Sequence, residues 1–147
     1  MKKIARLFAL MAFGLFGYWI YSEQLAPTPK HLNDISVLVT PVAKLAIKKY
    51  QVDGLSGLKD ISSKCYIDLQ KKPNNLNFLR CMTIDMTAES IDSCMSRAVG
   101  FPTDDYFNSL SIDVRVNIAK DYFNTSQIIE TKYLRILIKP LIDKELR

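Results

Sequence analysis

The sequence predicts an all-α protein, a small helical bundle preceded by an N-terminal hydrophobic segment. Three observations lead to this class. Apolar residues recur every three or four positions between turn signals, which is the period of an amphipathic helix. The chain is 48% hydrophobic and 24% charged, as expected of a packed globular region. Two cysteines, Cys65 and Cys81, also lie symmetrically about a turn, and they predict a disulfide-stapled helical hairpin within the bundle.

The N-terminus combines a basic start with an uncharged apolar run. Lys2 and Lys3 precede the segment from Leu7 to Tyr21, which carries no charge. With Arg6 directed toward the lipid headgroups, the stretch from Ile4 to Tyr21 approaches the roughly 20 residues that span a bilayer. Residues 1–22 are therefore predicted to be a signal anchor or a signal peptide.

The end of this segment favours an anchor that is retained. Tyr18, Trp19 and Tyr21 resemble an interfacial aromatic belt, and no small-x-small cleavage site follows them. The basic start predicts a single-pass protein of a bacterial inner membrane with its C-terminal part in the periplasm. The alternative is secretion to the periplasm after signal cleavage. A spacer containing two prolines, residues 23–32, then leads to the exported helical domain, residues 33–147.

The first part of the domain is expected to hold one helix followed by a loop. Thr40 and Pro41 suit the N-cap and the first helical position, and the helix is expected to end near Tyr50. Its buried face is predicted to carry Val42, Leu45 and Ala46. Residues 51–57, with Gly54 and Gly57, are expected to form a loop. Residues 33–39 fit either a short helix or a strand.

The next two helices form the predicted hairpin. Leu58, Ile61, Cys65 and Leu69 are spaced as one buried stripe of a helix that ends at the turn around Pro73. A long helix is expected from about Asn75 to Val99, and Gly100 supplies its stop signal. Cys65 and Cys81 each lie eight residues from Pro73, so a bridge between them would join the two helices. Cys94 is left over and is expected to be a buried free thiol.

Two further helices complete the bundle. A helix beginning at Ser111 is predicted to bury five residues on one face: Ile112, Val116, Ala119, Tyr122 and Phe123. A last helix starts near Thr125 and Ser126, and Pro140 is expected to kink or interrupt it. Its predicted buried face consists of Ile129, Tyr133, Ile136 and Leu137.

Acidic residues supply the candidate partner-binding site. Asp85, Glu89 and Asp92 recur at i, i+4 and i+7, which places them on one face of the long helix. They are interpreted as a solvated polar face, and their mutual repulsion favours an external positive partner. The turn from Phe101 to Phe107 contributes three more candidates to this site, Asp104, Asp105 and Tyr106.

Several functional classes lack support in the sequence. Without Lys2, Lys3 and Arg6 the chain has 17 basic and 15 acidic residues, and no basic run tracks a phosphate backbone, so no nucleic-acid partner is expected. His31, the one histidine, lies in the spacer, and the cysteine spacing matches no zinc motif. No metal, cofactor or catalytic residue is predicted.

The sequence therefore favours a non-enzymatic envelope protein that binds another protein, such as an inhibitor, an immunity-type protein or an accessory subunit. Export, the staple and the lack of catalytic motifs support this expectation. One alternative is a small envelope hydrolase that depends on the Asp85 and Glu89 carboxylates. Another is a purely structural envelope scaffold.

Overall fold

The computed structural model describes residues 29–100, 104–123 and 131–146. Residues 36–147 form one compact unit and residues 1–35 another, and of the latter only the helical residues 29–35 are described. Helix is the dominant structure and no strand occurs within these ranges, which confirms the predicted all-α class. No helix among the described residues is both long and apolar enough to cross a membrane. The predicted anchor, Ile4 to Tyr21, lies outside the described residues.

Helix α2, Pro29–Lys71, replaces the predicted helix, loop and second helix. It bends at Gly54, whose φ of 64° and ψ of −156° depart from helical values. A residue with a Cβ rarely adopts such a φ, so glycine permits the bend at this position. Gly57 is needed for a steric reason, because a Cβ there would lie 2.5 Å from the Cβ of Asp53. The prediction of a loop over 51–57 was wrong in its extent, because the break between the two helical stretches is a kink at Gly54 and the residues on both sides of it are helical.

The expected helix start at Thr40 and Pro41 was also wrong, since α2 begins at Pro29 and continues through Pro41. A proline removes one backbone hydrogen bond, and the apolar face of α2 continues on both sides of it. That face buries Val39, Ala43, Ala46 and Ile47, whereas Leu45, which was expected inside, is 51% exposed. Below, residues 36–53 are called the N-terminal arm of α2, and residues 55–71 the C-terminal arm.

Helix α3, Asn75–Val99, has the ends that the sequence predicts. Asn74 caps its start, because its side chain accepts a hydrogen bond from the Asn77 N–H at 2.8 Å. Gly100, at a φ of 73°, closes its end by donating to the Ser96 carbonyl. Every residue from Cys81 to Glu89 is buried, so the middle of α3 is enclosed on all sides.

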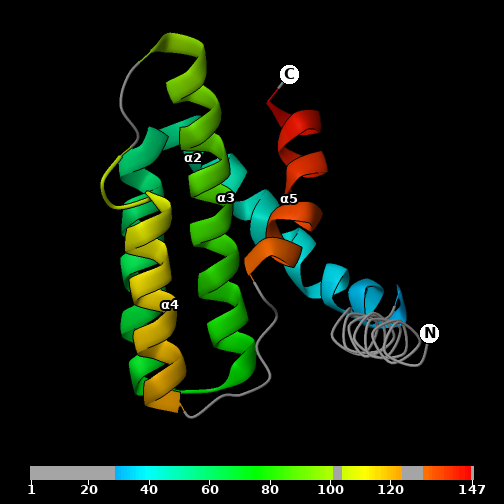
Figure 1. Cartoon of the computed structure of the whole chain (residues 1–147), viewed down its shortest axis with the longest axis vertical. Helices are drawn as coiled ribbons and strands as arrows, with labels where there is room; N and C mark the ends of the chain where they lie inside the picture. The colour runs from blue at the N-terminus through cyan, green and yellow to red at the C-terminus, as the bar shows by residue number, and fades with distance from the viewer. Residues whose placement is uncertain (1–28, 101–103, 124–130, 147) are drawn as a thin grey trace, which may run out of the picture. The chain divides into compact units, whose positions relative to one another are not determined.

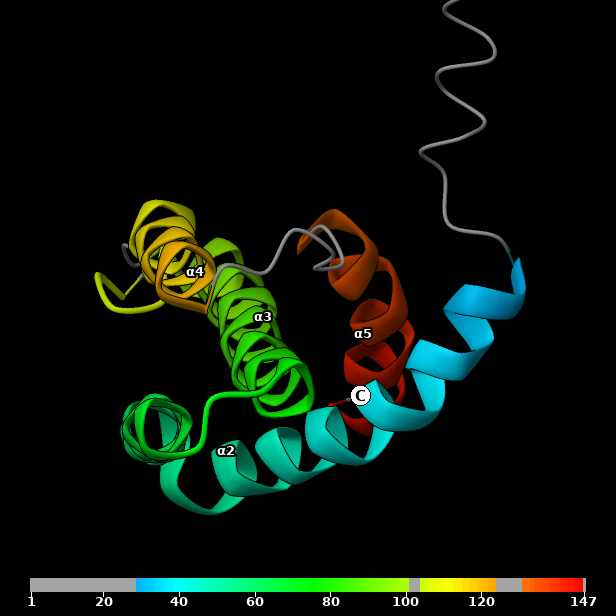
Figure 2. The same cartoon turned by 90° about the horizontal axis from the view of Figure 1, so that it is seen from below.

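Two shorter helices pack on opposite sides of α3 (Figure 1, Figure 2). Helix α4, Ser109–Phe123, begins two residues before the predicted Ser111, and Asn108 caps it by accepting from the Ser111 N–H. Its buried face contains Ile112, Val116 and Ala119, as expected, and the side chains of Tyr122 and Phe123, also predicted for this face, lie outside the described ones. Helix α5, Thr131–Glu145, runs through Pro140.

The predicted face of α5 was wrong at Ile136, while Tyr133 and Leu137, two other predicted members, are half-buried. Leu134, Ile138 and Ile142 are buried, while Ile136 is 66% exposed. Ile129, a further member of the predicted face, lies outside the described residues.

The predicted staple is confirmed. Cys65 on the C-terminal arm of α2 and Cys81 on α3 form a disulfide, with their Cα atoms 5.5 Å apart. The expectation for Cys94 was wrong, because this free cysteine is exposed.

Candidate functional site

The acidic stripe of α3 lies inside the protein. Asp85 is fully buried, Asp92 is 4% exposed and Glu89 is 8% exposed. The interpretation of these residues as a solvated face was therefore wrong. Buried carboxylates need partners, and each of the three finds them on another part of the chain.

Asp85 joins α3 to both α2 and α4. Its carboxylate accepts hydrogen bonds from the Ser62 hydroxyl, from the Tyr66 hydroxyl at 3.0 Å and from Arg115 Nε at 3.0 Å. Arg115 Nη2 lies 3.0 Å from the same carboxylate oxygen but makes no hydrogen bond. The Arg115 guanidinium also stacks on the Tyr106 ring, 4.1 Å from its centre.

Burial dominates the protonation of this cluster. It raises the pKa of Asp85 above the ordinary value, although Arg115, Ser62 and Tyr66 stabilise the charged form. Burial, followed by the neighbouring Asp85 carboxylate, raises the pKa of the Tyr66 hydroxyl. Tyr66 therefore remains a neutral hydrogen-bond donor to Asp85.

Glu89 and Asp92 bind the other elements packed on α3. Arg135 of α5 donates two hydrogen bonds to Glu89, from Nε at 2.8 Å and from Nη2 at 3.0 Å, and the Ser109 hydroxyl of α4 donates a third. Asp92 accepts from the backbone N–H of Asp104 at 2.7 Å, in the turn before α4. The stripe thus forms the ionic core that holds the helices together.

Arg115 and Arg135 were missed as partners of the stripe, although the sequence holds a signal for them. Neither arginine has an acidic residue three or four positions away on its own helix. Each also neighbours positions of a predicted apolar face. Such arginines need hydrogen-bond acceptors on another helix, and the acidic residues of α3 could supply them.

The turn before α4 is also engaged within the chain. Asp104 accepts from the Tyr106 N–H at 2.9 Å and pairs with Lys59 Nζ at 2.7 Å. Burial opposes its ionisation, but the hydrogen bonds from Lys59 and from the backbone outweigh that effect and lower the pKa of Asp104. The half-buried Tyr106 places its hydroxyl 3.1 Å from that of Ser62.

Of the six predicted partner-binding residues, Asp105 alone is classed as exposed. A role for the six in binding a partner stays a prediction. The structure gives all six internal contacts; Asp105 makes its contact through the backbone carbonyl, which accepts a hydrogen bond from the Ser111 hydroxyl.

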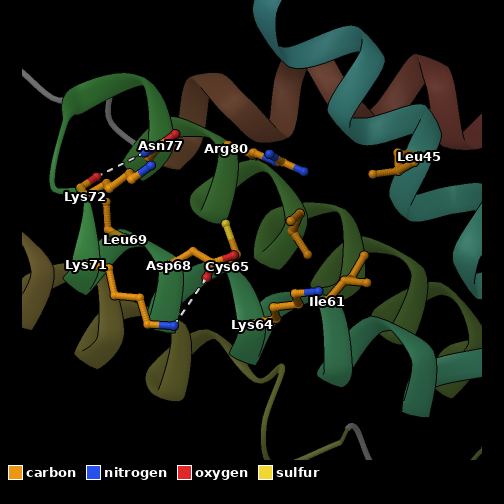
Figure 3. A pocket seen from close by; sticks show the side chains of 11 residues that line it. Leu45, Ile61, Lys64, Cys65, Asp68, Leu69, Lys71, Lys72, Asn77 and Arg80 are labelled. Atoms are coloured by element: carbon orange, nitrogen blue, oxygen red, sulfur yellow. Dashed lines mark hydrogen bonds and ion pairs between the residues drawn. The ribbon is translucent and has the colours of Figure 1, made fainter.

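A different feature has the geometry of a binding site, and the sequence analysis did not identify it. A pocket of about 530 Å³ lies between the two arms of α2 and the start of α3 (Figure 3). Apolar groups from all three segments line it, namely Leu45, Ile61, Leu69, Ile84 and the disulfide at Cys65. Its size is in the range typical of ligand-binding pockets.

Basic side chains surround these apolar groups. Lys64, Lys71, Lys72 and Arg80 line the pocket, together with one acid, Asp68. Lys71 lies 4.0 Å from Asp68, and the other three form no ion pair with the residues that the structure describes. All four basic residues are exposed, so their charges are available to an incoming group.

A second, smaller pocket extends the first. Its volume is about 240 Å³, and it is lined by Leu38 and Val42 of the N-terminal arm and by residues of α3, including Leu76 and Leu79. Asn77 and Arg80 line both pockets, so the two lie next to each other. We refer to both pockets together as the cationic groove. It offers an elongated apolar surface bordered by positive charge.

The described residues also bear on a possible metal site. No group of three or more metal-binding side chains occurs among residues 29–100, 104–123 and 131–146. No family model, curated protein or solved structure matches the chain. The fold and the groove define an all-helical, disulfide-bonded protein.

Proposed function

We propose that the chain is a non-catalytic protein-binding protein of the bacterial envelope and that the cationic groove is its binding site. In this proposal residues 4–21 anchor it in the inner membrane, and the domain from Asn33 onward faces the periplasm. The Cys65–Cys81 disulfide supports an oxidising compartment, because such bonds persist there and are rare in the cytosol.

The observation that carries the proposal is the composition of the groove. Leu45 is 51% exposed at one wall, and apolar side chains continue along the floor. Exposed apolar surface becomes favourable when a partner covers it, and unpaired cations select a partner that carries acidic groups. An inhibitor, an immunity-type protein and an accessory subunit would each use a surface of this kind.

The ionic core supports the non-catalytic part of the proposal. A carboxylate-dependent hydrolase would need Asp85 and Glu89 to reach a substrate. Both side chains are instead buried, and both accept hydrogen bonds from Arg115 or Arg135. Asp85 has no solvent access, and Glu89, which is 8% exposed, is held by Arg135 and Ser109.

Site-specific photocrosslinking in intact cells tests the proposal. A photoreactive residue replaces Leu45 in the full chain, and a matched probe replaces Ile136, which is 66% exposed and lies outside the groove. We expect a protein adduct from position 45 and little from position 136. The adduct should weaken several-fold when Lys64→Glu and Lys72→Glu are added, since both lysines line the groove.

A control variant separates groove charge from net charge. Lys44 and Lys144 are exposed and do not line the groove, so Lys44→Glu with Lys144→Glu changes the total charge equally. This variant should keep the adduct. Equal adducts from the two probe positions, or equal loss in the two double variants, would contradict the proposal.

A further inference from the structure

The outer face of α4 carries an apolar stripe that the fold leaves uncovered. Leu110, Val114 and Ile118 are 74%, 50% and 64% exposed. They lie four residues apart, so they follow one side of the helix. The opposite side of α4, with Ile112 and Val116, is buried against the bundle. The outer stripe therefore has the form of a helix face that docks into a groove.

The free charges beside this stripe are acidic. Asp113 and Asp121 are exposed and form no ion pair with the described part of the chain. The basic residues of α4 are less available, because Arg115 donates to Asp85 and Lys120 is half-buried. The outer face of α4 thus combines apolar groups with negative charge, which is the character that the groove selects.

The spacing of charges also agrees. Lys64 on the C-terminal arm of α2 and Lys72, one residue beyond the end of that helix, are eight residues apart, and Asp113 and Asp121 are eight residues apart on α4. The backbone N–H of Lys72 still donates to the Asp68 carbonyl, which continues the helical spacing past the end of α2. At 1.5 Å per residue each pair therefore spans about 12 Å. The stripe from Leu110 to Ile118 covers the same length, so two ion pairs and three apolar contacts can form in one register.

From this match we infer that α4 of a second copy of the chain occupies the cationic groove. The inference rests on the proposed function, in which the groove binds protein. Cations spread along the groove suit a ligand with charges along its length, whereas a lipid headgroup would need them gathered at one end. The acidic α4 face has that distribution of charge.

Such a contact joins two different surfaces. The first copy still offers its α4 and the second its groove, so association proceeds head to tail. The same contact would regulate the proposed function, because a partner protein with an acidic apolar face must displace α4 from the groove. Binding of the partner would then shorten the assemblies.

A charge-swap experiment tests the inference. The groove-reversed variant carries Lys64→Glu and Lys72→Glu, and the α4-reversed variant carries Asp113→Lys and Asp121→Lys. Sedimentation velocity of the full chain, in mild detergent matched to the solvent density, measures association. We expect concentration-dependent association of the wild type and at least tenfold weaker association of each variant alone, because like charges then face each other. Mixing the two variants should restore association.

Other results would overturn the inference. The inference fails if the wild type stays monomeric. It also fails if the two variants do not associate when mixed, although circular dichroism shows that both remain folded. Binding of the monomeric wild type to phosphatidylglycerol vesicles, lost in the groove-reversed variant, would indicate a lipid occupant instead. If self-association fails while the position 45 photocrosslink to another protein persists, the proposed function stands without this inference. If self-association and the photocrosslink are both absent, the inference and the proposed function both fail.

Discussion

The ion pair between Asp85 and Arg115 should be among the most costly contacts to break. Asp85→Ala removes the acceptor of Arg115, Ser62 and Tyr66 at a position with no solvent access. Leaving buried polar partners without an acceptor costs about 3–5 kcal/mol in the free energy of unfolding. Arg115→Ala should cost about 2 kcal/mol, because Asp85 keeps two hydroxyl donors and can take up a proton.

A double-mutant cycle isolates the pair. Because the two side chains contact each other directly, the double variant should be about 2 kcal/mol more stable than the sum of the single effects implies. Urea unfolding of the oxidised protein, followed by circular dichroism, measures each free energy. Asp68→Ala serves as the control: its pair with Lys71 is exposed and 4.0 Å long, so its loss should cost under about 0.5 kcal/mol.

A coupling energy below about 0.5 kcal/mol would refute the structural role assigned to this pair. So would an Arg115→Ala variant that is no less stable than the Asp68→Ala control. Either result would mean that the acids of α3 do not hold the helices together, and that they could be free for another purpose.

The pH dependence of the same residue gives an independent check. Burial raises the pKa of Asp85, so the folded protein holds this proton more tightly than the unfolded chain does. The stability that Asp85 contributes must therefore fall as the pH rises from about 4 through its folded pKa. Relative to Asp85→Asn, which cannot titrate, the wild type should lose stability over that range. A difference that does not change with pH would contradict the assignment.

Three further predictions concern the hairpin, the bend and the turn. Replacing Cys65 and Cys81 with alanine should lower the free energy of unfolding by about 3 kcal/mol, since the bridge closes a 16-residue separation; an unchanged urea midpoint would count against the staple. Gly54→Ala should cost about 1–3 kcal/mol from its backbone conformation alone, because no atom lies within 4 Å of the added Cβ; a neutral change in melting temperature would argue against the bend. Asp104 has a lowered pKa, so the stability from its pair with Lys59 is present above pH 4 and is lost as the pH falls; Asp104→Asn should cost about 1 kcal/mol near pH 7 and less in acid, and equal costs at both pH values would contradict this.

Local signals were sufficient for the hairpin. Asn74 caps the start of α3 with its side chain, and Gly100 caps its end with its backbone N–H. Both caps depend on neighbouring residues only. The Cys65–Cys81 bridge follows from the symmetry of two antiparallel helices about one turn. Such features can be predicted because they do not require knowledge of how distant helices pack.

Features that depend on tertiary contacts were not predictable in the same way. The rotation of α5 places Arg135 at Glu89, and this puts Leu134 and Ile138 in the core. Apolar spacing alone pointed to a different face of that helix. The acids of α3 were misread for the same reason, since their arginine partners lie 30 and 46 residues further along the chain.

The cationic groove was missed because it exists only after α2 bends. The bend at Gly54 turns the two arms of one helix so that Leu45 and Lys64 line the same pocket. In the sequence, Lys71 and Lys72 stand only as neighbours of the turn around Pro73. Their place beside exposed apolar groups becomes visible only in the folded chain.

Chemical labelling of lysines in intact cells is the most direct test of the central claim, that the cationic groove is a protein-binding site. An amine-reactive reagent is applied to cells and to the dilute purified chain, and mass spectrometry compares the labelling of Lys64 and Lys72 with that of Lys44 and Lys144. All four are exposed, and the first two line the groove. The account predicts that Lys64 and Lys72 are protected several-fold in cells relative to the purified chain, while Lys44 and Lys144 are not. Equal labelling ratios at all four lysines would contradict it.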